Sequence, residues 1–216
     1  MRLFLAFLLP AAVSEDVARA TAAVRAAADR VRWVPSARMH LTMKFLGDRP
    51  DHDVARIADE ARVALSTIAP FKATMRDAGA FPNFSRPRVV WLGMHPAASF
   101  AAIAARLERA LHPLGYPIES RPFVAHLTLG RVYDVLAPAQ RATLADSLAD
   151  SLADSLADSL ADSLGDSFAG SRSGLRVGWP LDVRELALVR SDLSRGPPPR
   201  GGPRYESLRT IPLGAP

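Results

Sequence analysis

The sequence has no cysteine and almost no lysine. Without thiols the chain has no disulfide framework, no thiolate metal site and no cysteine nucleophile. No stretch approaches the roughly 20 consecutive apolar residues that a membrane-spanning helix needs, so we expect no membrane partner. Hydrophobic residues make up 49% of the 216 residues and charged residues 23%. This composition is ordinary for a globular protein and excludes disorder of the whole chain.

The charge is unevenly distributed along the chain. Among the 27 basic residues only Lys44 and Lys72 are lysines, a bias that also fits a GC-rich genome. Residues 145–168 repeat the tetrapeptide ADSL and carry six aspartates without a basic residue. Without these six carboxylates the formal net charge would rise from +5 to +11. Such a basic body favours a polyanionic or phosphorylated partner.

The repeat itself is a poor core helix. A four-residue period against 3.6 residues per turn rotates the leucine row by about 40° per unit, so the row does not keep one face on a core. Aspartate and serine are also mediocre helix formers. We expect a repeat expansion within a surface helix, solvated or partly disordered; a partner-binding helix is the alternative.

Apolar spacing predicts alternating strands and helices. The run Leu3–Leu9, stopped by Pro10, predicts a buried strand, although a secretory signal peptide also begins in this way. Ser14 is the expected N-cap of the helix that follows. Further helices are predicted at 53–66 and 99–111, and strands at 40–46, 71–75, 88–94, 123–132, 183–190 and 205–211. The Pro- and Gly-rich segment 194–203 predicts a flexible loop.

Two of these strands begin with near copies of one motif. The segments are PSARMHLTMKFLG, containing His40, and PFVAHLTLGR, containing His126. Because side chains alternate along a strand, His40, Thr42 and Lys44 are expected on one face, and His126 and Thr128 on one face of the second strand. Each motif therefore presents an imidazole and a hydroxyl above an apolar back face.

This pair of motifs suits phosphodiester chemistry. Opening a phosphodiester needs a base for the attacking oxygen and an acid for the leaving oxygen, and imidazole can do either near neutral pH. A single H-L-T favours a histidine that merely caps a strand end, but two copies in one chain favour catalysis. His52 lies at a predicted helix start, and His95 and His112 precede prolines, so no metal-ligand spacing appears. No phosphate-loop or dinucleotide glycine pattern is present, and we expect no metal and no cofactor.

The paired H-x-T-x motifs resemble the two-histidine phosphoesterase superfamily, and the wider pattern resembles its RNA 2′,3′-cyclic phosphodiesterase branch (LigT-like, ThpR). The similar segments are the RLFLA opening, RWVPSARMHLTMKFLG, GAFPNFSRPRVVWLG, RPFVAHLTLGRV, ELALVRSDL and RYESL. The resemblance implies one bilobal α+β domain over residues 1–216. Two antiparallel sheets related by a pseudo-two-fold axis would flank a central cleft, with helices outside.

The resemblance also implies a reaction and its residues. It implies a phosphoric diester hydrolase that opens a 2′,3′-cyclic phosphate on RNA to a 2′-phosphomonoester, with His40 as proton donor and His126 as proton acceptor. Thr42 and Thr128 match phosphate-binding hydroxyls, and Arg131 matches a phosphate-binding arginine if a bulge at Gly130 turns it toward the cleft.

Several expectations remain open at this point. Lys44 is a possible RNA contact. Phe84, Phe123 and Tyr133 are candidates for base stacking, although core or loop anchoring is favoured for each. Relatives of this kind can also join RNA ends through a 2′–5′ bond, and we expect a cytoplasmic monomer. The alternatives are a non-catalytic RNA-end binder and a phosphodiesterase of another small cyclic phosphate.

Overall fold

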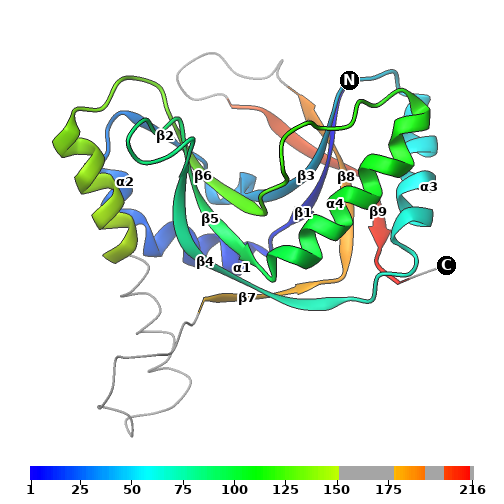
Figure 1. Ribbon diagram of the computed structural model, residues 1–216, viewed down its shortest axis with the longest axis horizontal. Coiled ribbons are helices and arrows are strands. Elements are labelled where there is room, and N and C mark those ends of the chain that lie inside the picture. Colours follow the sequence, from blue (N-terminus) through cyan, green and yellow to red (C-terminus); the bar gives the residue numbers. More distant parts are fainter. Residues whose placement is uncertain (151–177, 193–201, 215–216) are drawn as a thin grey trace, which may run out of the picture.

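The computed structural model describes residues 1–150, 178–192 and 202–214. These residues form an α+β fold with two antiparallel sheets, which confirms the expected fold class (Figure 1). Sheet A has the order β3-β1-β8-β9, and its strands are β1 (Arg2–Leu8), β3 (His40–Asp48), β8 (Glu185–Asp192) and β9 (Arg204–Pro212). Sheet B has the order β2-β6-β5-β4-β7, and its strands are β2 (Val31–Trp33), β4 (Phe71–Phe81), β5 (Val89–His95), β6 (His126–Val132) and β7 (Trp179–Val183).

The two halves repeat one strand–helix–strand unit. In the first half, β1 leads through α1 (Ala11–Ala20), α2 (Ala22–Ala27) and the short η1 (Ser36–Arg38) to β3, which pairs antiparallel with β1. In the second, β5 leads through α4 (Ala97–Leu111) and η2 (His112–Leu114) to β6, which pairs antiparallel with β5. The two motif strands, β3 and β6, contact each other across the sheets. This topology brings two segments that are distant in the sequence to one place.

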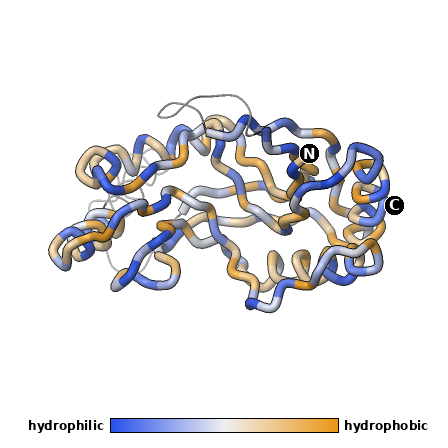
Figure 2. The backbone as a smooth tube through the Cα atoms, turned by 90° about the horizontal axis from the view of Figure 1, so that it is seen from above, coloured by the Kyte–Doolittle hydropathy of each residue, from blue (hydrophilic) through white to orange (hydrophobic). Residues whose placement is uncertain are grey.

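The helices cover the outer faces of the sheets. Helix α3 (Asp53–Leu65) packs beside α4 at one end of the molecule (Figure 1) and buries the apolar stripe that its spacing predicts: Val54, Ile57, Ala58, Ala61 and Leu65. Strand β1 is buried on both faces, because Leu3, Leu5 and Phe7 join the main core while Phe4 and Ala6 form a second cluster with Ala187 and Val189. Hydrophobic stretches accordingly gather along the inner strands (Figure 2).

Some predicted boundaries need correction. The first strand is confirmed, but α1 begins after Pro10, and Ser14 is buried inside the helix with its hydroxyl bonded to the Pro10 carbonyl at 3.0 Å. The predicted strand 183–190 is divided at Arg184, because β7 pairs with β4 in sheet B and β8 pairs with β1 in sheet A. The short strand β2 was not predicted, since three residues carry too little pattern.

The start of the ADSL repeat belongs to the core. A helix over residues 138–150 includes the first repeat unit, and both Leu144 and Leu148 are buried in the main cluster. The expectation of a solvated repeat is therefore wrong for this unit. Leu144 and Leu148 are four residues apart and share one helix face, because the rotation of the leucine row becomes large only over several repeat units. Residues 151–168 of the repeat and 194–201 of the Pro-Gly loop lie outside the described residues. Within the described part of the chain, no helix has the length and apolar character to cross a membrane.

Candidate active site

Strand β3 carries its motif on the sheet face that the helices leave uncovered, which we call the motif face. His40 pairs with Leu8 and Thr42 with Ala6, but Met43 is skipped, so that Lys44 pairs with Leu5 and Phe45 with Phe4. This bulge places Met43 and Lys44 consecutively on the core side. Phe45 therefore follows Thr42 on the motif face, and 65% of the residue is exposed.

Strand β6 contains a bulge at the equivalent position. His126 pairs with Gly93 and Thr128 with Trp91, Leu129 is skipped, and Arg131 pairs with Val89. From the histidine onward, six residues of β3 and six of β6 show the same sequence of half-buried, buried and exposed positions. Arg131 thus lies on the motif face with His126, at the position that Phe45 occupies in β3. The expected bulge exists, with Leu129 rather than Gly130 as the skipped residue.

Both imidazoles are held in one tautomer by the backbone. Nδ1 of His40 lies 2.8 Å from the carbonyl oxygen of Arg38, and Nδ1 of His126 lies 2.8 Å from that of Val124. A carbonyl oxygen only accepts hydrogen bonds, so Nδ1 must carry the proton in both rings. Nε2 of each neutral ring is left with a lone pair, as a general base or a reprotonated general acid requires.

Aromatic side chains pack against each imidazole. The His40 ring lies 4.9 Å from Phe4 and 5.0 Å from Tyr205 between ring centroids, and the Tyr205 contact is edge-on. The His126 ring lies 4.8 Å edge-on from Phe81 and 6.2 Å from Trp91. The sequence reasoning missed these neighbours, since they come from other strands and become visible only with the pairing of the sheets.

The environment of the site depresses both imidazole pKa values. Burial lowers the pKa of His40 and of His126, and the hydrogen bond from Nδ1 to the backbone opposes this shift in each ring. The positive charge of Arg131 lowers the pKa of both rings further. Arg131 therefore lies within electrostatic reach of both histidines, although they belong to different sheets. The structure brings His40, His126 and Arg131 together, and the register places Thr42 and Thr128 beside them on the same faces.

Lys44 does not lie with this group. The expectation that it shares the face of His40 is wrong, because the bulge at Met43 turns its side chain to the core side. There its ammonium is 2.6 Å from Glu108 Oε2 on α4 and donates to the Pro117 carbonyl at 2.9 Å. With 4% of its side chain exposed, Lys44 acts as a structural cation in this fold.

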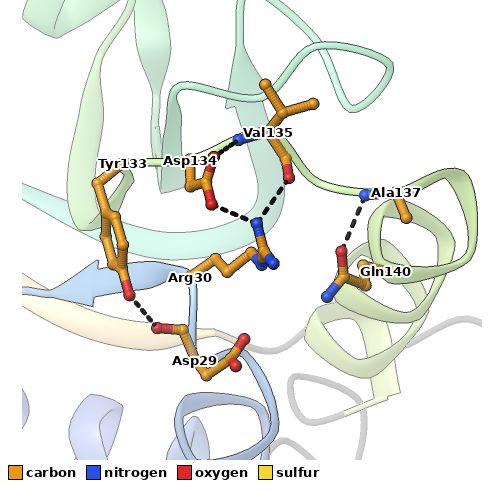
Figure 3. A network of polar contacts seen from close by, with 7 residues as sticks. All are labelled: Asp29, Arg30, Tyr133, Asp134, Val135, Ala137 and Gln140. Carbon is orange, nitrogen blue, oxygen red and sulfur yellow. Dashed lines mark hydrogen bonds and ion pairs between the residues drawn. The ribbon is translucent and has the colours of Figure 1, made fainter.

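The three aromatic candidates for base stacking make contacts that stabilise the fold. Phe84 and Phe123 are partly buried against the main core. Figure 3 shows Tyr133 donating its hydroxyl hydrogen to the carbonyl of Asp29 at 2.8 Å, beside an ion pair of Arg30 with Asp134. These contacts tie the segment after β6 to the turn before β2, so Tyr133 anchors a loop.

The described residues contain no group of three or more His, Asp or Glu placed to hold a metal ion. His52 lies 3.7 Å from Asp53 at the start of α3, and Nδ1 of His112 lies 3.4 Å from the Tyr116 carbonyl. Neither histidine lies on the motif strands.

Comparison with known proteins identifies the family. The family model described as LigT like phosphoesterase matches residues 8–91 and 93–156, a range that includes both motif strands. The chain belongs to this family. A relative named RNA 2′,3′-cyclic phosphodiesterase from Methanothermobacter thermautotrophicus is 34% identical over 146 residues, covering 68% of this chain and 77% of the relative. Further relatives with this name match over 36% to 72% of their own length.

Solved structures of other proteins share the fold. A crystal structure of TT0787 from Thermus thermophilus superposes with a TM-score of 0.70 at 26% identity and covers 100% of this chain and 99% of that one. Escherichia coli LigT complexed with 3′-AMP gives a TM-score of 0.66 at 25% identity over 98% and 97% of the two chains.

Proposed function

We propose that the protein hydrolyses 2′,3′-cyclic phosphate ends of RNA to 2′-phosphomonoesters. The observation that carries this proposal is the convergence of two imidazoles, each with Nδ1 fixed so that Nε2 carries the lone pair, on one arginine that influences both. Family membership and the names of the relatives support the choice of a cyclic phosphodiester as substrate.

The resemblance to the family supplies the division of roles between the two histidines. His126 Nε2 accepts a proton from water as the water oxygen attacks phosphorus. His40, protonated at Nε2, donates its proton to the 3′ oxygen as the P–O3′ bond breaks, which leaves the phosphate on the 2′ oxygen. The guanidinium of Arg131 and the hydroxyls of Thr42 and Thr128 stabilise the charge that builds up on the phosphoryl oxygens. Proton exchange with solvent then restores both rings.

The lowered pKa of His40 suits this role once the substrate is bound. In the free protein the burial of His40 and the charge of Arg131 disfavour the imidazolium form. A bound phosphate brings a negative charge to the same place and favours that form again. The general acid is therefore charged mainly when there is a substrate to protonate.

Phe45 supplies an aromatic surface for the terminal nucleobase. Its exposed ring lies on the motif face two strand positions beyond Thr42 and packs against Phe4 at 5.9 Å. An exposed aromatic ring beside a phosphate site is a stacking platform for an unpaired base. We expect the base on the Phe45 side and the phosphate on the Arg131 side.

The deciding assay uses RNA that ends in a 2′,3′-cyclic phosphate, incubated with EDTA, with the position of the product phosphate as readout. A metal-independent 2′-phosphate product supports the proposal. Complete loss of activity in EDTA, restored by one divalent ion, refutes the two-imidazole mechanism.

The roles of the two histidines are separated by the leaving group. His40→Ala and His126→Ala should each lower kcat by about 10²–10⁴-fold. A substrate whose leaving oxygen needs no protonation should rescue His40→Ala and leave His126→Ala inactive. The opposite rescue pattern reverses the assignment, and near-normal turnover in both variants refutes the two-histidine mechanism.

A further inference from the structure

A second polar group lies on the motif face of sheet B, beside His126. Gly93 on β5 pairs with His126 on one side and with Arg76 on the other, so these three residues form one row across the sheet. His95 follows Gly93 by two residues and therefore faces the same way. The intervening Gly93 has no side chain to separate His126 from Arg76.

The group is built around a bulge in β4. Asp77 is the extra residue between Arg76 and Ala78, and it adopts a positive φ of 62°. Residues other than glycine seldom adopt this conformation, and such backbone strain is concentrated at functional sites. The bulge directs Asp77 Oδ2 to within 3.0 Å of His95 Nε2 and 3.7 Å of Arg76 Nε. One carboxylate oxygen thus holds an imidazole and a guanidinium together.

His95 Nε2 is engaged by Asp77, but part of the donor capacity of Arg76 is not used by the described residues. Arg76 Nε is buried and has no hydrogen-bond partner among the described residues, although the Arg76 side chain as a whole is 30% exposed. His95 is also partly exposed. Helix α4 begins at Ala97, two residues after His95, with no acidic residue in its first turn, so the positive end of the helix adds to the field here. These features suit an anion.

The position of the group suggests which anion. Neighbouring strands lie about 4.8 Å apart and each residue advances about 3.3 Å along a strand. His95 lies one strand and two residues away from His126, so their Cα atoms are about 8 Å apart across the sheet face. Consecutive phosphates of an RNA strand are joined through one ribose and span a similar distance. A strand whose cyclic phosphate lies between His40 and His126 can therefore place its preceding phosphate at Arg76 and His95.

We propose that Arg76 and His95 bind the phosphate on the 5′ side of the terminal nucleotide, with Asp77 as the residue that positions them. This inference rests on the proposed function and extends it. It distinguishes an enzyme for RNA ends from one for free nucleoside cyclic phosphates, since only the former substrate carries a 5′ phosphodiester.

The test compares two substrates that differ only at this group. One is adenosine 2′,3′-cyclic phosphate, and the other is the same nucleotide with a 5′-methyl phosphate, which has the charge of an RNA linkage. We expect kcat/KM of the wild-type protein to be about 10-fold or more higher for the 5′-methyl phosphate, the effect of one or two charge-assisted hydrogen bonds. This preference should shrink as salt is added.

Arg76→Gln and His95→Gln should each remove most of the preference, and Asp77→Asn part of it. Arg62→Gln is the matched control, because Arg62 is an exposed arginine on α3 that pairs with Asp59, and it should keep the full preference. Both substrates are measured on the same protein sample, so the ratio does not depend on the folded fraction of a variant.

Equal kcat/KM for the two substrates in the wild-type protein overturns the inference, as does a full preference in Arg76→Gln and His95→Gln. If the wild-type protein opens neither cyclic phosphate while RNA ends are also left intact, the proposed function fails and the inference falls with it.

Discussion

Replacing Lys44 separates a structural role from a role in RNA binding. Lys44→Met keeps most of the aliphatic stem and removes the ammonium that Glu108 and the Pro117 carbonyl share. Glu108 is then left with a largely buried carboxylate, since its side chain is 17% exposed, and it keeps a hydrogen bond from the Glu119 amide at 3.2 Å.

The size of the effect follows from the burial of the pair. Removing one partner of a fully buried ion pair costs about 3–5 kcal/mol, and the residual exposure of Glu108 places this case at the lower end, about 3 kcal/mol. For a chain of this length such a loss lowers Tm by about 6–12 °C. Lys44→Met combined with Glu108→Leu should recover much of the loss, because apolar groups can replace a buried pair at little cost.

The assay combines urea unfolding with kinetics on RNA ending in a 2′,3′-cyclic phosphate. Lys72→Met is the control, because Lys72 is the other lysine of the chain and pairs with Asp182 while its side chain is 83% exposed; its free energy of unfolding should change by less than about 1 kcal/mol. We expect Lys44→Met to lower stability and to leave KM unchanged. Unchanged stability with a raised KM would refute this reasoning and return Lys44 to the RNA interface.

Three further predictions concern the aromatic platform, the histidines and the repeat. Phe45→Ala should raise KM for nucleotide substrates by about 10-fold, the value of one stacked base, while Phe45→Tyr and the distant Val63→Ala should not; an unchanged KM in Phe45→Ala argues against stacking. Because the pKa values of His40 and His126 are lowered in the folded protein, the unfolded chain binds more protons at mildly acidic pH, so the free energy of unfolding without ligand should fall as the pH drops below about 6.5. A smaller fall in the double variant His40→Asn/His126→Asn, measured by urea unfolding, checks this. Leu148→Ala should cost about 2–5 kcal/mol, so a deletion of residues 145–164 should also destabilise the protein; wild-type stability in Leu148→Ala would show that the repeat is peripheral.

Spacing within one element was enough to predict much of the fold and the chemistry. The apolar stripe of α3 is a property of thirteen consecutive residues, and all five of its predicted inward positions are buried. The duplicated H-L-T motif likewise predicts two histidines with nearby hydroxyls, and the structure places both on motif strands that contact each other. Local periodicity determines such features, so a sequence is sufficient to find them.

Features that depend on pairing between strands could not be predicted in this way. Strict alternation assigns Lys44 to the face of His40, and only the skipped Met43 in the register with β1 reverses that assignment. Tyr205 reaches His40 from a strand that is not adjacent to β3. The group of Arg76, Asp77 and His95 is assembled by a bulge in β4 opposite β5. In each case the decisive information lies in a partner strand.

The bulges in β3 and β6 are followed by residues of different chemistry. After the bulge, β3 continues with Lys44 and Phe45, and β6 with Gly130 and Arg131. A side chain at Gly130 would collide with Val31, whose Cγ1 would lie 2.6 Å from an added Cβ, because β2 pairs with β6 at this point. Among the described strands, β3 is an edge strand of sheet A, so no neighbouring strand restricts the side chain at position 44. Helix α4 supplies Glu108 as the ion-pair partner of Lys44.

This asymmetry explains how two histidines with the same tautomer and the same kind of backbone hydrogen bond can take different roles. Burial and Arg131 depress the pKa of both rings in the same direction, so the free protein alone does not make one of them the acid. The exposed residues that follow the bulges do differ, since one half presents an aromatic ring and the other a guanidinium. In the proposed mechanism, a base stacked on Phe45 and a phosphate held by Arg131 would place the ribose and its departing 3′ oxygen on the side of His40 and the attacking water on the side of His126. Under this proposal, the orientation of the substrate relative to Phe45 and Arg131 assigns the proton donor and the proton acceptor.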